Sequence, residues 1–213
     1  MVTKNWSPQL YTPYNLYVFV KNNPVQFIDY LGLSTCKITI NENVGPISDG
    51  YGGWYSGVTR PNLPSNLSVL PVPNKPNKYK IKAEASCNIT VLYAGTGKEI
   101  HDGNTTVEEH ERSHVDYSQS NFSQVISLYK SYNDMVVCGE KCANAIYRFL
   151  STYRDWKETY NFYQNKQFDC DTYSPGSQQE RVCKEAKNLE KQYMDKEKEN
   201  NRDREVMEKA CKP

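Results

Sequence analysis

Five consecutive residues of the chain, His110-Glu111-Arg112-Ser113-His114, have the types and the spacing of a metal-dependent hydrolytic site. Side chains four residues apart lie on one face of a helix, so both imidazoles could reach one zinc ion at about 2.0–2.1 Å. Glu111 would have a different task, because a carboxylate beside the first ligand can take a proton from zinc-activated water. The motif therefore predicts Zn²⁺ bound by His110 and His114, with Glu111 as the catalytic base of a hydrolase.

A catalytic zinc site of this kind needs a third protein ligand. His101 is the only other histidine and precedes the motif, so we expect a carboxylate in this position. The stretch Glu140-Lys-Cys-Ala-Asn144 resembles the E-x-x-A-D element that carries the glutamate ligand of gluzincin peptidases, with Asn144 in place of the usual aspartate. This resemblance implies Glu140 as the third metal ligand.

Glu140 can serve only if the chain reverses early. An unbroken helix from residue 106 to residue 132 would place Glu140 about 27 Å from His114 along the axis. We therefore expect a helix break between Ser118 and Ser123, where polar side chains can compete for backbone hydrogen bonds. A continuous helix followed by an antiparallel return would instead make Asp155 or Glu158 the candidate. Asp169-Cys-Asp171-Thr172 faintly resembles an Asp-x-Glu-Thr element of some bacterial H-E-x-x-H domains, and this resemblance adds Asp169 and Asp171 as candidates.

The motif must be positioned by a helix whose start is marked in the sequence. Thr105-x-x-Glu108 matches a capping box and predicts a helix that begins at Thr106 and runs at least through His114. Helical character continues to about Phe168. Residues 177–213 have mixed charge with a few apolar residues at helical spacing, which predicts a solvated helical tail.

Strand patterns precede this helix. Alternating polar and apolar residues predict strands within 36–43 and 79–93, the second region forming a pair of strands joined near Ser86-Cys87. The proline-rich stretch 58–78 is expected to be an extended loop. The expected fold class is α+β, with a small antiparallel sheet packed on a helical, zincin-like subdomain that carries the motif.

The first 35 residues differ in composition from the rest of the chain. Three short matches within residues 14–33 resemble the end of the core of bacterial Rhs/YD-repeat proteins, which precedes a variable C-terminal toxin; they are Asn15-Leu16-Tyr17, Asn22-Asn23-Pro24 and Asp29-x-x-Gly32-Leu33. Tyr30 departs from the family pattern, which has proline after the motif aspartate. Because of this departure, the resemblance does not imply that the chain cleaves itself after Leu33, as proteins of the family do. Taken alone, the segment also fits a β-hairpin that turns at Asn22-Asn23-Pro24.

The Rhs resemblance implies a division into three parts: 1–35 as a remnant of the Rhs core, 36–176 as a toxin domain, and 177–213 as the charged tail. It also implies that the toxin is secreted or delivered into a target cell within a larger bacterial protein. The expected partners are the Rhs core shell and a cognate immunity protein.

The motif, following strands and lying at a helix start, resembles zincin metallopeptidases. This resemblance implies a protein or peptide substrate, which could add to an edge strand through backbone hydrogen bonds. The expected function is therefore a zinc metallopeptidase toxin. A binding or inactive toxin module whose motif holds no metal is the alternative, and a nuclease toxin is a weaker third.

Composition limits the other classes of function. Lys and Arg total 26 against 25 Asp and Glu, a formal net charge of +1, so no overall field favours a nucleic-acid partner. The mean hydropathy is −0.79 and no run of 18 apolar residues occurs, so we expect no membrane span.

Seven cysteines are many for a reduced cytosolic protein, and an odd number cannot all pair within one chain. Whether disulfides form is left open by the sequence, and small buried thiols are the expected state of most of the seven. Cys138 and Cys142 have no matching second pair, which gives a structural zinc site there little support.

Overall fold

The computed structural model describes residues 36–48, 54–102 and 105–212. All of these belong to one compact unit that extends from Leu33 to the C-terminus. The segment that resembles an Rhs core, and the hairpin expected within it, lie outside the described residues.

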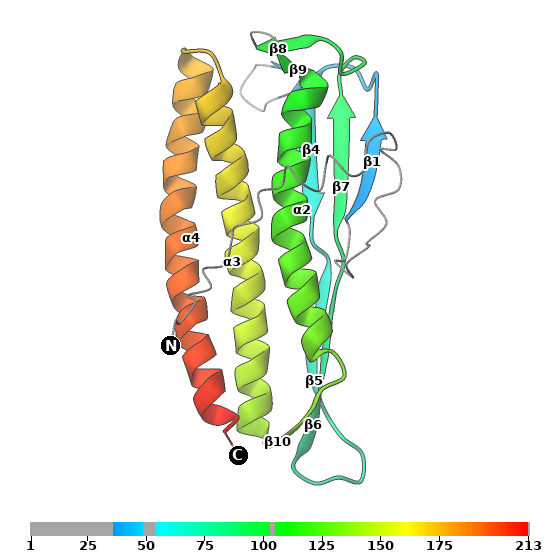
Figure 1. Cartoon of the computed structure of the whole chain (residues 1–213), viewed down its shortest axis with the longest axis vertical. Coiled ribbons are helices and arrows are strands. Elements are labelled where there is room, and N and C mark those ends of the chain that lie inside the picture. Colours follow the sequence, from blue (N-terminus) through cyan, green and yellow to red (C-terminus); the bar gives the residue numbers. More distant parts are fainter. Residues whose placement is uncertain (1–35, 49–53, 103–104, 213) are drawn as a thin grey trace, which may run out of the picture. The chain divides into compact units, whose positions relative to one another are not determined.

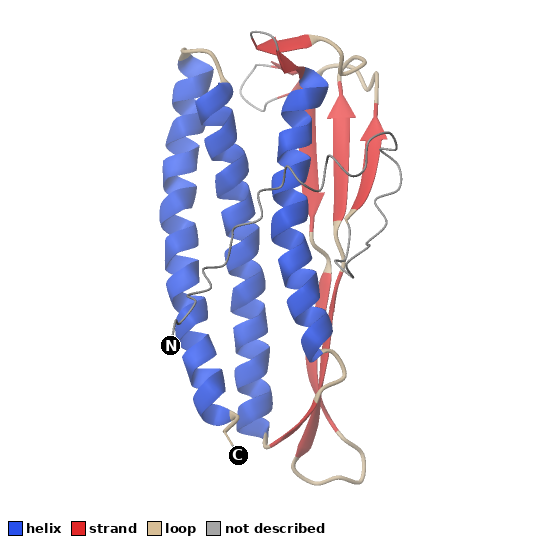
Figure 2. Ribbon diagram, in the orientation of Figure 1, coloured by secondary structure: helices blue, strands red, loops and turns tan. Residues whose placement is uncertain are grey.

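The described residues form an α+β fold, as predicted (Figures 1 and 2). The strands are β1 (Lys37–Asn41), β2 (Ile47–Ser48), β3 (Trp54–Tyr55), β4 (Gly57–Asn62), β5 (Ser65–Pro71), β6 (Lys78–Ala85), β7 (Asn88–Tyr93), β8 (Ile100–Asp102), β9 (Thr105–Thr106) and β10 (Val136–Cys138). The helices are α2 (Val107–Tyr132), α3 (Glu140–Thr172) and α4 (Ser177–Ala210). The three helices lie side by side, and the longer strands lie beyond α2 (Figure 1).

The strands form two three-stranded sheets rather than one antiparallel sheet. Their orders are β1-β7-β4 and β10-β6-β5, and β1 runs parallel to β7. The prediction that β6 and β7 pair with each other is wrong, because each belongs to a different sheet. Short two-stranded pairs, β2-β3 and β8-β9, complete the described strands.

The proline-rich stretch 58–78 is mostly strand, so its prediction as a loop is wrong. It contains most of β4 and all of β5, which carry Pro61 and Pro71. Both strands are at the edge of their sheets, where a residue without an N–H group does not interrupt pairing with a second neighbour. Proline spacing alone could not distinguish edge strands from loop.

Helix α2 begins one residue later than its capping box predicts. Thr106 is the N-cap: its hydroxyl accepts the Glu109 N–H at 3.2 Å, and the Glu109 carboxylate accepts the Thr106 N–H at 2.9 Å. The frame is therefore Thr106-x-x-Glu109, with Thr105 in the short strand β9.

The predicted break between Ser118 and Ser123 is wrong, because α2 is continuous to Tyr132. Two of the polar side chains bond to carbonyls of their own helix: Asn121 Nδ2 donates to Tyr117 O at 3.0 Å, and Ser123 Oγ donates to Ser120 O at 3.1 Å. Such bonds leave the backbone ladder intact. Apolar contacts also hold the segment, since Phe122 and Val125 are fully buried in the core.

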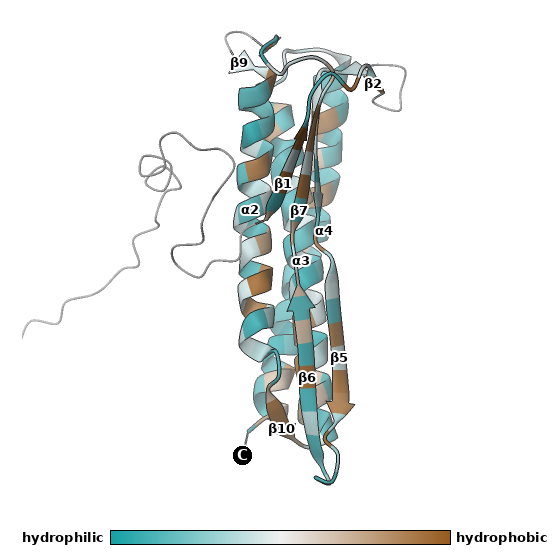
Figure 3. Ribbon diagram, turned by 90° about the vertical axis from the view of Figure 1, so that its right-hand side faces the viewer, coloured by the Kyte–Doolittle hydropathy of each residue, from teal (hydrophilic) through white to brown (hydrophobic). Residues whose placement is uncertain are grey.

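The core lies between the sheets and the helices α2 and α3. Its largest fully buried apolar side chains are Ile81, Ile89, Val91, Val107, Phe122, Val125, Tyr129 and Leu150. Hydrophobic residues are visible along β1, β5 and β7 and in patches on α2 (Figure 3). None of the described helices is both long enough and apolar enough to cross a membrane.

Helix α4 is part of the same compact unit, although the sequence suggests a separate tail. It packs along α3 and carries buried side chains at Val182, Ala186, Asn200 and Asp203. Two disulfides join the helices near opposite ends, Cys170–Cys183 and Cys142–Cys211. The helix predicted within residues 177–213 is therefore observed at Ser177–Ala210, where it packs on α3.

Six cysteines are paired, so the expectation that most are thiols is wrong. The third disulfide, Cys36–Cys87, joins the residue before β1 to the turn between β6 and β7. Cys138 is the one free cysteine of the described chain and is exposed. Since Cys142 is bonded to Cys211, Cys138 and Cys142 do not form a metal site.

Candidate metal centre

The first turns of α2 place the motif residues inside the protein. Among the described residues, His110, Glu111 and His114 form the one group of three side chains close enough to hold a metal ion, with ligand atoms within 4.8 Å of one another. They are 2%, 4% and 8% exposed. Helical spacing alone brings the two rings together, and the Nε2 atoms of His110 and His114 are 3.1 Å apart.

Asp169, in the last turns of α3, supplies a carboxylate to this group. Its Oδ1 lies 3.2 Å from His110 Nε2 and 2.9 Å from His114 Nε2, and its side chain is 13% exposed. Because α3 runs back along α2, the end of α3 meets the beginning of α2. Asp169 was only one of several alternatives in the sequence.

Glu140 does not reach the histidines, which corrects its assignment as the third metal ligand. It is the first residue of α3, and at 1.5 Å per residue it lies about 43 Å from Asp169 along the helix. The reason is the continuity of α2, which carries the chain away from the motif before α3 begins.

The remaining acids also lie elsewhere. Asp155 is paired with Arg154 at 2.6 Å, and Glu158 precedes Asp169 by about 16 Å of helix. Asp171 is exposed and accepts a hydrogen bond from Gln167 at 2.8 Å. Of the acids considered from the sequence, only Asp169 contacts the motif.

The atoms from His110, His114 and Asp169 fit a zinc ion. Three ligands at 2.0–2.1 Å from one zinc in tetrahedral arrangement lie about 3.3 Å from each other, and here the separations are 2.9, 3.1 and 3.2 Å. The donor set of two imidazoles and one carboxylate is also one that zinc prefers. These three residues could therefore hold Zn²⁺ and leave a fourth position open.

The electrostatics of the group favour a cation at its centre. Burial alone would raise the pKa of Asp169, but its contacts with His110 and His114 outweigh burial and lower the pKa to about 2. Burial disfavours charge on His114 as well, yet Asp169 and Glu111 raise the His114 pKa. Without a metal, a proton on the imidazole provides the positive charge that the carboxylate needs.

Glu111 is held from the opposite side by strand β4. The Thr59 hydroxyl donates to Glu111 Oε2 at 2.7 Å and lies 3.3 Å from the Glu111 carbonyl oxygen. Burial raises the pKa of Glu111, and the nearby His114 and the Thr59 hydrogen bond only partly oppose it. A carboxylate with a raised pKa is a better proton acceptor near neutrality.

Gly57 allows β4 to approach α2 this closely. A Cβ atom at this position would lie 2.6 Å from Val107 Cγ1 and 2.9 Å from Glu111 Cγ, which is closer than carbon atoms pack. The glycine is therefore required by space and not by a left-handed backbone.

Aromatic rings enclose the two motif histidines. Phe168 lies 5.0 Å from His110 and 5.3 Å from His114 between ring centroids, and Tyr173 stacks on His110 at 5.8 Å. The centroid of His101, from β8, is 4.0 Å from that of His110 at an interplanar angle of 36°. This separation indicates ring packing, since imidazoles that share a zinc point their nitrogens, not their faces, toward the ion.

Burial and the negative charge of Asp169 raise the pKa of Tyr173. The Tyr173 hydroxyl therefore keeps its proton at neutral and moderately alkaline pH and remains a hydrogen-bond donor beside the site.

Sequence reasoning missed Thr59, Asn165 and Tyr173 as neighbours of the site. Asn165, whose Oδ1 is 2.6 Å from His114 Nδ1, had a usable signal, because it lies four residues before Asp169 on one helix face. Thr59 and Tyr173 come from a strand and a helix end whose positions depend on the tertiary fold.

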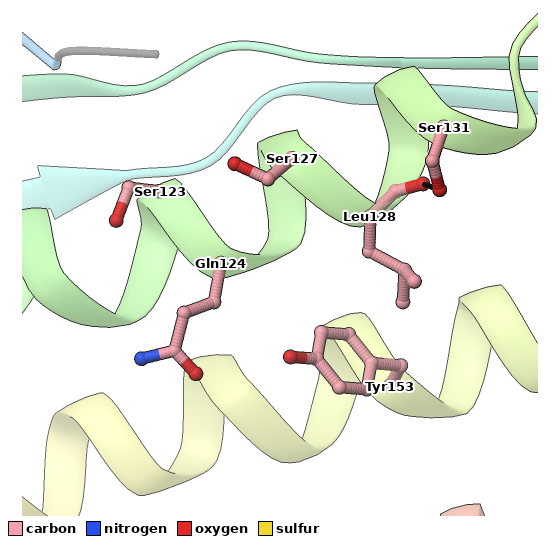
Figure 4. Close-up of a pocket in the computed structure, with 6 residues that line it drawn as sticks. All are labelled: Ser123, Gln124, Ser127, Leu128, Ser131 and Tyr153. Carbon is pink, nitrogen blue, oxygen red and sulfur yellow. Dashed lines mark hydrogen bonds between the residues drawn. The ribbon is translucent and has the colours of Figure 1, made fainter. Parts of the chain in front are cut away.

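A surface pocket between α2 and α3 lies away from this centre. It has a volume of about 450 Å³ and is lined by Ser123, Gln124, Ser127, Leu128, Ser131 and Tyr153. Figure 4 shows Gln124 pointing from α2 toward α3, and Tyr153 rising from α3 toward α2. Because it contains none of the motif residues, it is a separate feature of the α2–α3 contact.

Comparison with known proteins gives no assignment: no protein-family model, no curated protein and no solved structure matches this chain. The function proposed below therefore follows from the site itself.

Proposed function

We propose that this chain is a zinc-dependent hydrolase in which His110, His114 and Asp169 bind the metal and Glu111 is the general base. The observation that supports this most is the convergence of two imidazole Nε2 atoms and one carboxylate oxygen within 3.2 Å, beside a second buried acid, Glu111. Three protein ligands and one open position are typical of catalytic zinc, whereas structural zinc takes four protein ligands.

The residues have separate roles in this reaction. Bound zinc supplies Lewis acidity, which polarises a substrate carbonyl and acidifies a water molecule. Glu111 accepts the proton of that water and returns it to the leaving amine. Thr59 holds Glu111 Oε2 and so leaves Oε1 for proton transfer. Asp169 balances part of the positive charge at the centre.

We propose a protein or peptide as the substrate. Strand β4, which carries Thr59, pairs with β7 and with no other described strand. Its second edge can therefore pair with an extended peptide through backbone hydrogen bonds, next to Glu111. An edge strand beside the helix that carries the motif also supports the proposal of a zincin-like active site.

We further propose that the domain is the toxin of an Rhs-type protein, secreted or delivered into a target cell and paired with an immunity protein. The resemblance of residues 14–33 supports this proposal. Three disulfides also support it, because they are typical of proteins that mature outside the reducing cytosol.

The test combines metal content with hydrolysis. Elemental analysis of protein purified without chelator should find about one zinc per chain, which His110→Ala should lose. The wild type should cleave an unfolded protein substrate, whereas Glu111→Gln should retain zinc and lose cleavage. Glu108→Gln is the matched control, since Glu108 lies on the exposed side of the same helix and pairs with Arg112. Wild-type protein without any transition metal would refute the proposal.

A binding module without metal is the second candidate, and the burial of the motif favours it. With His110 and His114 at most 8% exposed, a protonated His114 paired with Asp169 could act as a buried ion pair instead. This candidate predicts that chelators change neither stability nor activity. A salt-dependent nucleic-acid shift would instead support a nuclease.

A further inference from the structure

A short run of amide side chains on α3 lies behind His114, against the ring nitrogen that does not face Asp169. Asn165 Oδ1 is 2.6 Å from His114 Nδ1, and Asn165 Nδ2 is 2.7 Å from the main-chain oxygen of Asn161. Asn165 Nδ2 also lies 3.2 Å from Asn161 Oδ1. Asn165 therefore connects the helix backbone to one of the two motif histidines.

These contacts determine which way the Asn165 amide points. A main-chain carbonyl oxygen only accepts hydrogen bonds, so the end of Asn165 that faces Asn161 O must be the NH₂ group. The end that faces His114 is then the carbonyl oxygen, which also only accepts. His114 Nδ1 must donate to it and therefore carries a proton.

The tautomer of His114 follows from this. A neutral imidazole with a proton on Nδ1 has its lone pair on Nε2. His114 Nε2 is the atom that lies 2.9 Å from Asp169 Oδ1 and 3.1 Å from His110 Nε2. The lone pair therefore points to the position that a shared metal ion would occupy.

We infer that Asn165 is a positioning residue that selects the metal-binding tautomer of His114. The inference rests on the proposed metal centre for its functional meaning. In the other tautomer, Nε2 would carry the proton and donate a hydrogen bond to Asp169. Neither His114 Nε2 nor this carboxylate oxygen could then bind a metal ion until the proton moved. Partners of this kind change metal affinity by about 10- to 100-fold.

Asn165 is itself held by neighbours on both helices. Asn161 is fully buried, and its Oδ1 lies 3.5 Å from Asn121 Nδ2 on α2. Asn121 Nδ2 donates to Gln164 Oε1 at 2.6 Å, and Gln164 Nε2 donates to the Tyr160 hydroxyl at 3.2 Å. This network limits rotation of Asn165 and fixes the register of α2 against α3 near the site.

The test reads the tautomer directly, in metal-free protein labelled with ¹⁵N-histidine, at alkaline pH where the rings are neutral. Long-range ¹H–¹⁵N NMR spectra distinguish the two tautomers, and a His114→Asn spectrum identifies the His114 signals. We expect the Nδ1–H form in the wild type. Asn165→Leu should shift His114 toward the Nε2–H form and weaken zinc binding by about 10- to 100-fold.

Two variants separate positioning from general damage. Asn165→Asp keeps an acceptor toward His114 and should retain the Nδ1–H form. Gln167→Leu alters a half-buried residue of the same helix, which donates a hydrogen bond to the exposed Asp171 and not to the motif, and should change neither tautomer nor affinity. Circular dichroism checks that each variant is folded.

The outcomes distinguish this inference from the proposed function. A wild-type protein with Nδ1–H at His114 that binds no zinc would refute the metal centre and leave the tautomer assignment standing. A wild-type protein that binds zinc but has Nε2–H at His114 when metal-free would overturn the inference. Unchanged tautomer and affinity in folded Asn165→Leu would overturn it as well.

Discussion

His110 Nε2 lies 3.2 Å from Asp169 Oδ1, although 59 positions separate the two residues in the chain. The contact exists because α2 and α3 are both continuous and lie side by side in opposite directions. Cys170 follows Asp169 directly and is bonded to Cys183 of α4, which anchors this end of α3. The candidate metal centre therefore depends on the helical hairpin as much as on the motif.

The first prediction tests the third ligand. Asp169→Ala should weaken zinc binding by more than 100-fold, about 3 kcal/mol. Loss of a residue that only contacts a metal ligand costs about 10- to 100-fold in affinity, and Asp169 would itself be a charged ligand. Isothermal titration with zinc measures the affinity. Glu140→Ala is the matched control, and its affinity should stay within about threefold of wild type because Glu140 lies at the other end of α3. Equal losses in both variants would contradict the assignment of Asp169.

The second prediction concerns the hydrogen bond from Thr59 to Glu111. Thr59→Val keeps the shape of the side chain and removes the donor at 2.7 Å. Because this hydrogen bond lowers the pKa of Glu111, its loss should raise that pKa further. The acid limb of the pH profile of kcat/KM should then move to higher pH, with zinc content unchanged. An unshifted profile would show that Thr59 does not act on the base.

The third prediction is the pH dependence of metal binding and of stability without metal. The pKa of His114 is raised above its ordinary value of 6.5, so the metal-free protein retains a proton that zinc must displace. Zinc affinity should therefore rise as pH increases through the raised pKa, with proton release detectable by calorimetry in buffers of different ionisation enthalpy.

The same raised pKa has the opposite effect on the stability of the metal-free fold. Protonation of His114 stabilises this fold fully below about pH 6.5, and the contribution is lost as pH rises through the folded-state pKa. Chemical denaturation of metal-free protein across this range measures the trend, with His114→Asn as the control that should abolish it. Stability that increases over the same interval in a His114-dependent manner would contradict the prediction.

The fourth prediction compares two disulfides between α3 and α4. Removing Cys170–Cys183, which closes a separation of 13 residues, should cost about 3 kcal/mol of unfolding free energy and also weaken zinc binding, because Asp169 is adjacent. Removing Cys142–Cys211, with a separation of 69, should cost about 4 kcal/mol and leave the zinc affinity of the folded protein unchanged.

Paired serine substitutions measured by denaturation and zinc titration test this comparison. Cys138→Ser is the control for substitution at a free cysteine, and it should alter neither quantity. Equal loss of zinc affinity in the two double variants would show that the effect is general destabilisation.

Some features of the site are local and were therefore predictable from the sequence. The i, i+4 spacing of His110 and His114 brings the rings together on any helix, and the capping residues begin that helix within one position of where it was expected. The α+β class follows from the change in period between the strands and the helices.

Other features were decided by the tertiary structure. Whether Glu140 or Asp169 meets the histidines depends on whether α2 breaks near Ser118, and the same polar residues can break a helix or bond to its carbonyls. Burial of Phe122 in the core keeps the helix whole, which no local pattern encodes. The separation of β6 and β7 into two sheets and the three cysteine pairings have the same origin. Each depends on how whole elements pack together, so the free energy that selects the partner comes from the core and not from the local sequence.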